Sequence, residues 1–298
     1  VGNTNTLGAV TIVSAADVGV NGLRAASFEQ TAGTGTTTIN TGAFTSTPQG
    51  MATTASAGVV INNDVITIND SIDTTGNGVV TLTTDNGLLT IAADGDITAD
   101  GAVQLTGSTG IQTAGDITTT ADNVTFKSAT TLTSGIVINT GAGAGTVAFN
   151  DTLDSAASAA STLDITAGSG NIDFDAAVGS ATNGKLGAIT IVSATDVTAD
   201  STIEAASLVQ NAGTLTTLTD NVTTTTAAGV DITATDIRLD GLTINTNTGN
   251  GIVRMNGSTR LDAAVTITRG TGAVTFTGTV DSEGSETNNL TINGTSGG

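Results

Sequence analysis

The chain carries LGAVTIVSAADV at residues 7–18 and repeats it, nearly unchanged, as LGAITIVSATDV at residues 186–197. The likeness continues further along, because GAVQLTG at residues 101–107 matches GAVTFTG at residues 272–278. Self-similarity over such a length is typical of repeat proteins, in which each unit packs only on its neighbours. The repeat therefore decides the fold class before any local motif is considered.

We expect residues 1–298 to form a single continuous repeat array. Within it, residues 7–107 are duplicated as residues 186–278, and residues 108–185 supply related coils between the two copies. Composition supports a folded array rather than a disordered one. Charged residues make up only 11% of the chain, and the mean hydropathy of +0.20 is higher than that of disordered proteins. The core must consist of small aliphatic side chains, because the chain has no Trp, Tyr, Cys or His and only six Phe.

Short runs of alternating β-branched and polar residues predict strands almost everywhere, separated by turns rich in Gly, Asn and Asp. Residues 145–165, 170–189 and 272–292 repeat one small unit: a glycine turn, a strand ending in Phe, a short strand, a polar loop and another strand. A unit of this size predicts one coil of a parallel β-solenoid. We expect about 15 coils and a rod of about 70 Å, at about 4.8 Å per coil. Alternation predicts inward side chains at Phe126, Phe149, Phe174 and Phe276.

The main alternative is a string of antiparallel sandwich domains. Such domains usually need a large core anchor such as Trp or a corner Tyr, and this chain has neither. Residues 154–161 are the one segment with helix-compatible composition, but they show no apolar stripe and are expected to form a loop. The all-β solenoid is therefore the preferred fold.

The Gly-x-(Val/Ile)-x-(Phe/Leu/Ile) units and the bias toward Thr, Ala, Gly, Asn and Asp resemble the repetitive passenger regions of bacterial surface exoproteins. Filamentous-haemagglutinin-like and autotransporter-type β-solenoids are the nearest groups. The resemblance covers the whole chain, but it is compositional and carries over no active-site residue. It implies export, an extended shape and a surface, adhesive or fibre role outside a bacterial cell.

The net charge of −20 disfavours nucleic acid and anionic membranes as partners, because both need clustered Lys and Arg. No stretch of about 20 apolar residues exists to span a bilayer. Without His or Cys, the common general base and the thiol nucleophile are missing, so we do not expect this protein to be an enzyme. Asp173 and Asp175 alternate with inward Ile172 and Phe174, which predicts a solvated pair of carboxylates rather than a catalytic one.

Calcium is the one cofactor that the residues suggest. Asp94, Asp96 and Asp100 lie in Gly-containing turns around a short strand, and closely spaced carboxylates supply the hard oxygen ligands that Ca²⁺ prefers. Plain surface turns are the competing interpretation, because neither an EF-hand loop nor a Gly-Gly-x-Gly-x-Asp motif is present. A second acidic group, Asp281, Glu283 and Glu286, is expected in a solvated loop or against a neighbouring molecule.

Thr-x-Thr pairs recur on the predicted strands, at Thr81/Thr83, Thr131/Thr133, Thr266/Thr268 and Thr275/Thr277. Outward Thr pairs in register resemble the surfaces of ice-binding solenoids. Their uneven spacing instead favours a generic strand surface. An adhesin or ice-binding module nevertheless stays the alternative to a purely structural role.

The two ends share one phase of the repeat, since residues 1–10 and 280–292 both resemble residues 178–189. Neither end has the polar character of a capping coil. The chain begins at Val1 without a signal-peptide pattern, as a mature form or an excised segment would. We expect copies of the protein to stack head to tail, or the repeat to continue in a longer chain. The expected function is therefore an extracellular structural element of a bacterial surface fibre, sheath or stalk, with itself as partner and divalent cations as possible bridges.

Overall fold

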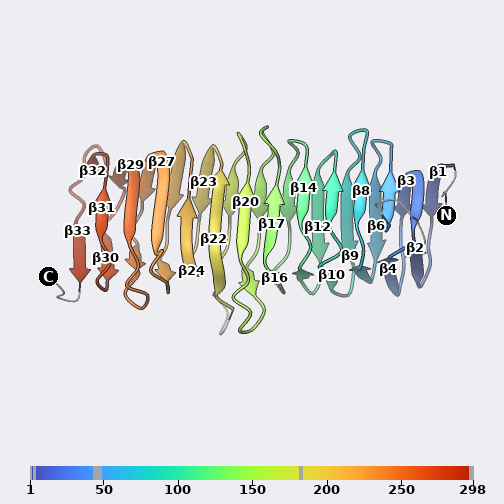
Figure 1. The fold of residues 1–298 in the computed structure, drawn as a ribbon, viewed down its shortest axis with the longest axis horizontal. Coiled ribbons are helices and arrows are strands. Elements are labelled where there is room, and N and C mark those ends of the chain that lie inside the picture. The colour runs from blue at the N-terminus through green and yellow to red at the C-terminus, as the bar shows by residue number, and fades with distance from the viewer. Residues whose placement is uncertain (1, 3–4, 43–48, 181–183, 295–298) are drawn as a thin grey trace.

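A computed structural model shows a rod of stacked parallel strands with the termini at opposite ends (Figure 1). It describes residue 2 and residues 5–42, 49–180 and 184–294. These residues form 33 strands and no helix, and the paired strands run parallel to one another. The predicted all-β parallel solenoid is thereby confirmed.

Three ladders of strands run along the rod, and we call them the first, second and third faces. In the first coil, β1 (Leu7–Ile12) lies on the first face and β2 (Val18–Asn21) on the second. The chain then enters β3 (Leu23–Gln30), whose first half pairs on the third face and whose second half bends onto the first. Every later coil visits the faces in the same order.

The first face contains β1, the second half of β3 and eleven further strands or strand halves. These are β6 (Val59–Asn63), β9 (Val80–Thr84), β12 (Val103–Gly107), β15 (Val124–Phe126), β18 (Val147–Phe149), β21 (Ile172–Phe174), β23 (Asp196–Ala199), β25 (Leu215–Leu218), the second halves of β27 (Val230–Leu239) and β29 (Val253–Leu261), and β32 (Val280–Ser282).

The second face starts at β2 and ends at β33 (Leu290–Gly294), with a single bridging residue, Val178, in place of one strand. The strands between them are β4 (Thr36–Asn40), β7 (Val65–Ile68), β10 (Leu89–Ile91), β13 (Ile111–Thr113), β16 (Thr130–Leu132), β19 (Leu153–Ser155), the first half of β24 (Ile203–Gln210), β26 (Val222–Thr224), β28 (Thr243–Asn245) and β30 (Val265–Arg269).

The third face continues from the first half of β3. It contains β5 (Met51–Thr53), β8 (Ile72–Thr74), β11 (Ile97–Ala99), β14 (Ile117–Thr119), β17 (Ile136–Asn139), β20 (Leu163–Thr166), β22 (Leu186–Ser193), the second half of β24, the first halves of β27 and β29, and β31 (Val274–Phe276).

The described chain makes about 13 coils, so the rod is about 60 Å long at about 4.8 Å per coil. The expected 15 coils were too many because the coils are longer than about 20 residues on average. Side-chain hydrogen bonds between neighbouring coils join residues from 19 to 29 positions apart. The loops at the corners absorb this variation, while the strands keep their register.

Inward-facing residues of all three faces meet in one continuous core. Phe126, Phe149 and Phe174 lie in one column of the first face and are buried, as alternation predicts. Their rings stack, with centroids 4.6 Å apart for the first pair and 5.5 Å for the second. Phe276 packs against the core but is only partly buried, because β31 has a strand on one side and none on the other.

Residues 154–161 form no helix, as expected, but they are not all loop. Asp154 and Ser155 belong to β19, whose parallel partner is β16. The loop comprises residues 156–161, and the Ser155 hydroxyl accepts a 2.9 Å hydrogen bond from the Ser161 backbone N–H.

The repeated sequences adopt the same register on different faces. In the first copy, Leu7 pairs with Ala25 at the end of the third face, and Val10 pairs with Phe28 on the first face. In the second copy, Leu186 pairs with Ala205 at the end of the second face, and Ile189 pairs with Leu208 on the third face. The second copy is thus turned by one face about the rod axis relative to the first.

Buried glutamines mark this relationship. The Thr37 hydroxyl donates to Gln30 Oε1 at 2.5 Å, and the Thr216 hydroxyl donates to Gln210 Oε1 at 2.8 Å. Both glutamine side chains also donate to a backbone carbonyl two residues further on. A core polar network is therefore repeated together with the sequence around it.

Candidate functional surfaces

Acidic and amide side chains in the turns hold neighbouring coils together. Asp17 Oδ1 accepts a 2.9 Å bond from the Thr36 N–H, and Asp116 Oδ1 accepts a 2.7 Å bond from the Val137 N–H. Asn221 does the same for Thr243 at 2.7 Å. Each bond satisfies a backbone donor at a corner, where no ladder partner is available. Many turn carboxylates therefore have a structural task.

The three predicted calcium ligands lie around β11, with Asp94 and Asp96 before the strand and Asp100 after it. Asp96 Oδ1 accepts a 2.8 Å bond from the Asp116 N–H on the next coil. Asp100 accepts a 2.9 Å bond from the Asn77 N–H and a 2.8 Å bond from the Thr120 hydroxyl. The bond from the Asn77 backbone is the main cause that lowers the pKa of Asp100, and the bond from Thr120 lowers it further. Asp94 is exposed in the turn before β11.

Among the described residues, no group of three or more carboxylates is arranged to hold a metal ion. Asp96 and Asp100 instead flank opposite ends of a three-residue strand, and both already accept hydrogen bonds from neighbouring coils. Calcium binding stays a prediction, and comparing melting in chelator with melting in millimolar calcium tests it.

A patch of aspartates surrounds Asp173 on the outer side of the first face. Burial raises the pKa of Asp173 above its ordinary 3.8, and the nearby carboxylates of Asp175, Asp200 and Asp196 raise it further. The charged form is therefore disfavoured in the folded protein. The resulting destabilisation is fully present above the raised pKa and is relieved as the pH falls through it toward 3.8.

The second acidic group begins with Asp281 in β32 and continues with Glu283 and Glu286 in the loop that follows, and all three residues are exposed. The Ser282 hydroxyl accepts a 2.7 Å bond from the Asn288 N–H, and the Asn288 amide donates to Glu286 Oε2 at 3.3 Å. The same Ser-to-backbone bond closes the loop after β19. These carboxylates are thus exposed beside a loop whose closing bond occurs twice in the chain.

The predicted Thr pairs are distributed over all three faces and build no single surface. Thr81 and Thr83 lie in β9 on the first face, Thr266 and Thr268 in β30 on the second, and Thr275 in β31 on the third. Thr131 is in β16, and Thr133 follows that strand.

A regular polar grid does occur on the second face, near the N-terminal end. Thr38, Thr67 and Thr90 stack in register on successive coils. Beside them, Asn69 donates to Asn40 at 2.9 Å and Asn40 donates to Asn21 at 3.2 Å, forming a ladder of amides. Spacing in sequence did not reveal these rows, because their members come from coils of unequal length.

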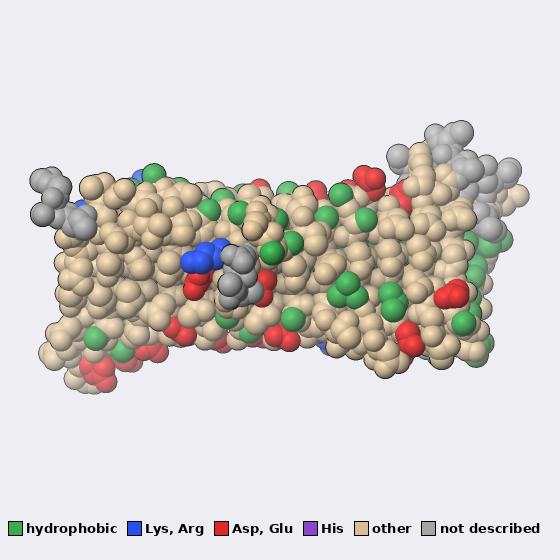
Figure 2. Space-filling model, turned by 90° about the horizontal axis from the view of Figure 1, so that it is seen from below, with side chains coloured by type: hydrophobic (Ala, Val, Ile, Leu, Met, Phe, Trp, Pro, Cys, Tyr) green, Lys and Arg blue, Asp and Glu red, His purple; other side chains and the backbone are tan. Residues whose placement is uncertain are grey.

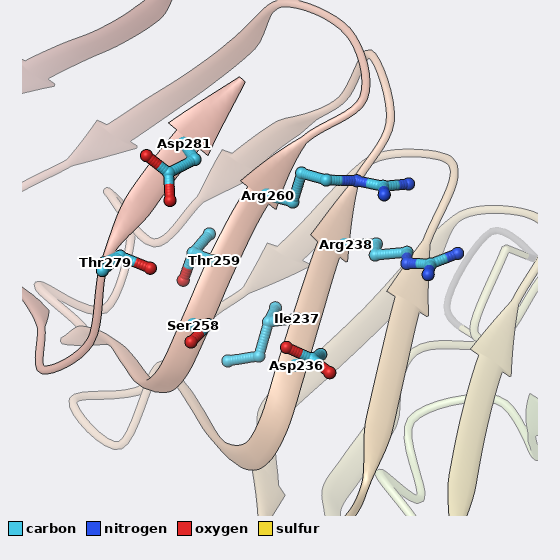
Figure 3. A pocket seen from close by; sticks show the side chains of 8 residues that line it. All are labelled: Asp236, Ile237, Arg238, Ser258, Thr259, Arg260, Thr279 and Asp281. Carbon is cyan, nitrogen blue, oxygen red and sulfur yellow. The ribbon is translucent and has the colours of Figure 1, made fainter. Parts of the chain in front are cut away.

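A shallow hollow of about 410 Å³ lies on the first face toward the C-terminal end. Figure 3 shows Arg238 and Arg260, in register on β27 and β29, with their side chains pointing the same way. Arg260 forms a two-point ion pair with Asp262, which raises its pKa. Asp236 and Asp281 also line the hollow, so its acidic groups offset the two guanidinium charges.

Both ends of the rod expose apolar side chains. At the N-terminal end, Val10, Ile12, Val18 and Val20 are only partly buried and line an open depression with Leu23 and Phe28. Figure 2 shows hydrophobic side chains gathered at this end, on the right, whereas they are scattered along the side of the rod. At the C-terminal end, Val280 and Ile292 are exposed.

No helix in the described part of the chain is long and apolar enough to cross a membrane. Comparison with known proteins finds no match: no family model, no curated protein and no solved structure is significantly similar to the chain. The structure agrees with the resemblance to bacterial exoproteins only at the level of the parallel β-solenoid fold.

Proposed function

We propose that this protein is a structural element of an extracellular fibre, sheath or stalk on a bacterial surface, and that it lengthens by end-to-end stacking. The observation that carries the proposal is the pair of open ends on an otherwise closed solenoid. Backbone ladders run the length of the rod, and within the described ranges β1 and β2 at one end and β32 and β33 at the other pair with a strand on one side only. Such edges are templates for a further strand.

The remaining surface supports a mechanical role rather than a chemical one. The turn carboxylates are engaged between coils, as at Asp96 and Asp116, and the hollow around Arg238 is shallow and charge-balanced. The acidic exterior keeps separate rods apart sideways through like-charge repulsion. Growth along the axis is then favoured over lateral aggregation. The resemblance to surface exoproteins supplies the extracellular location.

Sedimentation velocity over a range of protein concentrations tests the proposal. We expect the sedimentation coefficient of the unmodified protein to rise with concentration, as rods join. Ile292→Lys places a charge on the exposed apolar end and should abolish this rise. Val137→Lys is the matched control, because Val137 is similarly exposed but lies on the side of the rod. Concentration-independent sedimentation of the unmodified protein would contradict the proposal.

A binding module is the second candidate, favoured by the polar grid on the second face. The rows of Thr38, Thr67 and Thr90 and of Asn21, Asn40 and Asn69 repeat at the coil spacing, so they suit a ligand that is itself repetitive, such as a polysaccharide or ice. Replacing Thr67 with Lys should then abolish retention on such a surface and leave sedimentation unchanged.

A further inference from the structure

The two open ends belong to the same three ladders. One column of the first face runs from Val10 in β1, through Phe28 and Val59, to Thr259 and Val280 in β32. On the second face, β2 is the first strand and β33 is the last. The strand edges at the two ends therefore face along the same axis, and each is the continuation of the other.

The coil order shows how the ends meet. The last coil visits the third face at β31, the first at β32 and the second at β33, so the next position in the spiral is on the third face. Gly2, which precedes β1, lies at that position. A Cβ at Gly2 would stand 2.4 Å from the backbone oxygen of Arg24, which is in the third-face half of β3.

One position of the spiral inside the chain is likewise occupied by a bridging residue instead of a strand. Val178 bridges Leu153 on one coil and Ile203 on the next, in place of a strand. Gly179 follows it with a φ of 72°, close to the 77° of Gly2, and a Cβ at Gly179 would stand 2.0 Å from the Glu204 oxygen. A single residue and a glycine are thus sufficient to fill one position of the spiral.

Burial shows what the ends lack. Leu7 is 38% exposed, whereas its counterpart in the second copy, Leu186, is 1% exposed beneath a preceding coil. Ile292 is 48% exposed, whereas Ile267, one coil earlier in the same column, is fully buried. The buried equivalent of each exposed end residue is thus covered by a further coil.

We propose that the C-terminal end of one copy binds the N-terminal end of a second copy without rotation, so that each face continues across the junction. This inference rests on the proposed end-to-end function and specifies its partner and register. β1 of the second copy pairs with β32, placing Val10 on Val280, Thr11 on Asp281 and Ile12 on Ser282. β2 pairs with β33, so that Val18 covers Ile292.

Disulfide trapping tests the register, since the chain contains no natural Cys. Thr11 and Asp281 are exposed and point outward, and adjacent strands place paired Cα atoms about 4.8 Å apart, within the range a disulfide spans. Under oxidation, Thr11→Cys combined with Asp281→Cys should give a ladder of covalent multimers on a non-reducing gel. The two positions lie at opposite ends of the rod, so they cannot be joined within one molecule.

Two matched variants report the other orientations. Thr11→Cys with Thr291→Cys traps β1 on β33, and Thr11→Cys with Thr275→Cys traps β1 on β31. Multimers that form fastest with Asp281→Cys support the proposal. Faster multimers in either other variant overturn the proposed register while leaving end-to-end stacking in place. If no variant gives multimers, although the unmodified protein associates, docking through β1 is wrong. If the unmodified protein also sediments as single rods, the proposed function fails as well.

Discussion

Phe149→Ala should destabilise the protein by about 4–5 kcal/mol. Truncating a buried Phe typically costs about 3–5 kcal/mol, because transfer free energy is lost and a cavity remains. Phe149 is at the upper end of this range, since its ring is stacked between Phe126 at 4.6 Å and Phe174 at 5.5 Å. Each lost ring contact contributes about 0.5–1.5 kcal/mol beyond the buried area.

Urea denaturation followed by far-ultraviolet circular dichroism measures the loss, because the chain has no Trp or Tyr for fluorescence. Phe276→Ala is the internal control. Its side chain is only partly buried in the last coil, so its truncation should cost at most about 2 kcal/mol. A loss below about 1 kcal/mol for Phe149→Ala, or equal losses for the two variants, would refute the inward column of stacked rings.

Three further predictions concern the core polar network, a corner glycine and the acidic patch. Gln210→Ala should cost about 1–3 kcal/mol in a denaturation experiment, because the Thr216 hydroxyl loses its buried partner; a loss as small as that of an outward glutamine would contradict the network. Gly229→Ala should cost at least about 1–3 kcal/mol, since φ is 62° and a Cβ would stand 2.1 Å from the Ile252 oxygen; Gly8→Ala, with open space around it, is the control and should melt like the parent. Asp173→Asn should raise the melting temperature at pH 7, and the gain should vanish below about pH 4, where the parent aspartate is also neutral; a gain independent of pH would show that burial and neighbouring charge do not act on it.

The fold class was predictable because strand signals and repetition agree throughout the chain. β-branched residues alternate with polar ones, and inward positions such as Phe126, Phe149 and Phe174 are buried as that alternation requires. The number of coils was less predictable, because strand patterns do not encode corner length. Val10 and Phe28 are register partners, and so are Phe28 and Val59, although the two pairs differ greatly in separation along the chain.

The roles of the surface residues were not predictable, because they depend on which residues the coil register brings side by side. Asp96 bonds the backbone of Asp116 on the next coil, a contact that no local motif indicates. The pairing of Arg238 with Arg260 and the ladder from Asn21 to Asn69 likewise require the coil register. Local spacing suggested a calcium site at Asp94, Asp96 and Asp100 because it places carboxylates close in sequence. The structure shows that hydrogen bonds from neighbouring coils already engage Asp96 and Asp100.

The duplication explains why the ends resemble internal coils. A repeat that is turned by one face between its two copies still matches strand to strand, because all three faces present the same inward aliphatic rows.

Cryo-electron microscopy of the concentrated protein tests the central claim most directly. We expect rods longer than one molecule, with a coil spacing of about 4.8 Å that runs unbroken through the junctions between copies. Single rods of about 60 Å at every concentration, or copies joined side by side, would contradict an element that lengthens by stacking its ends.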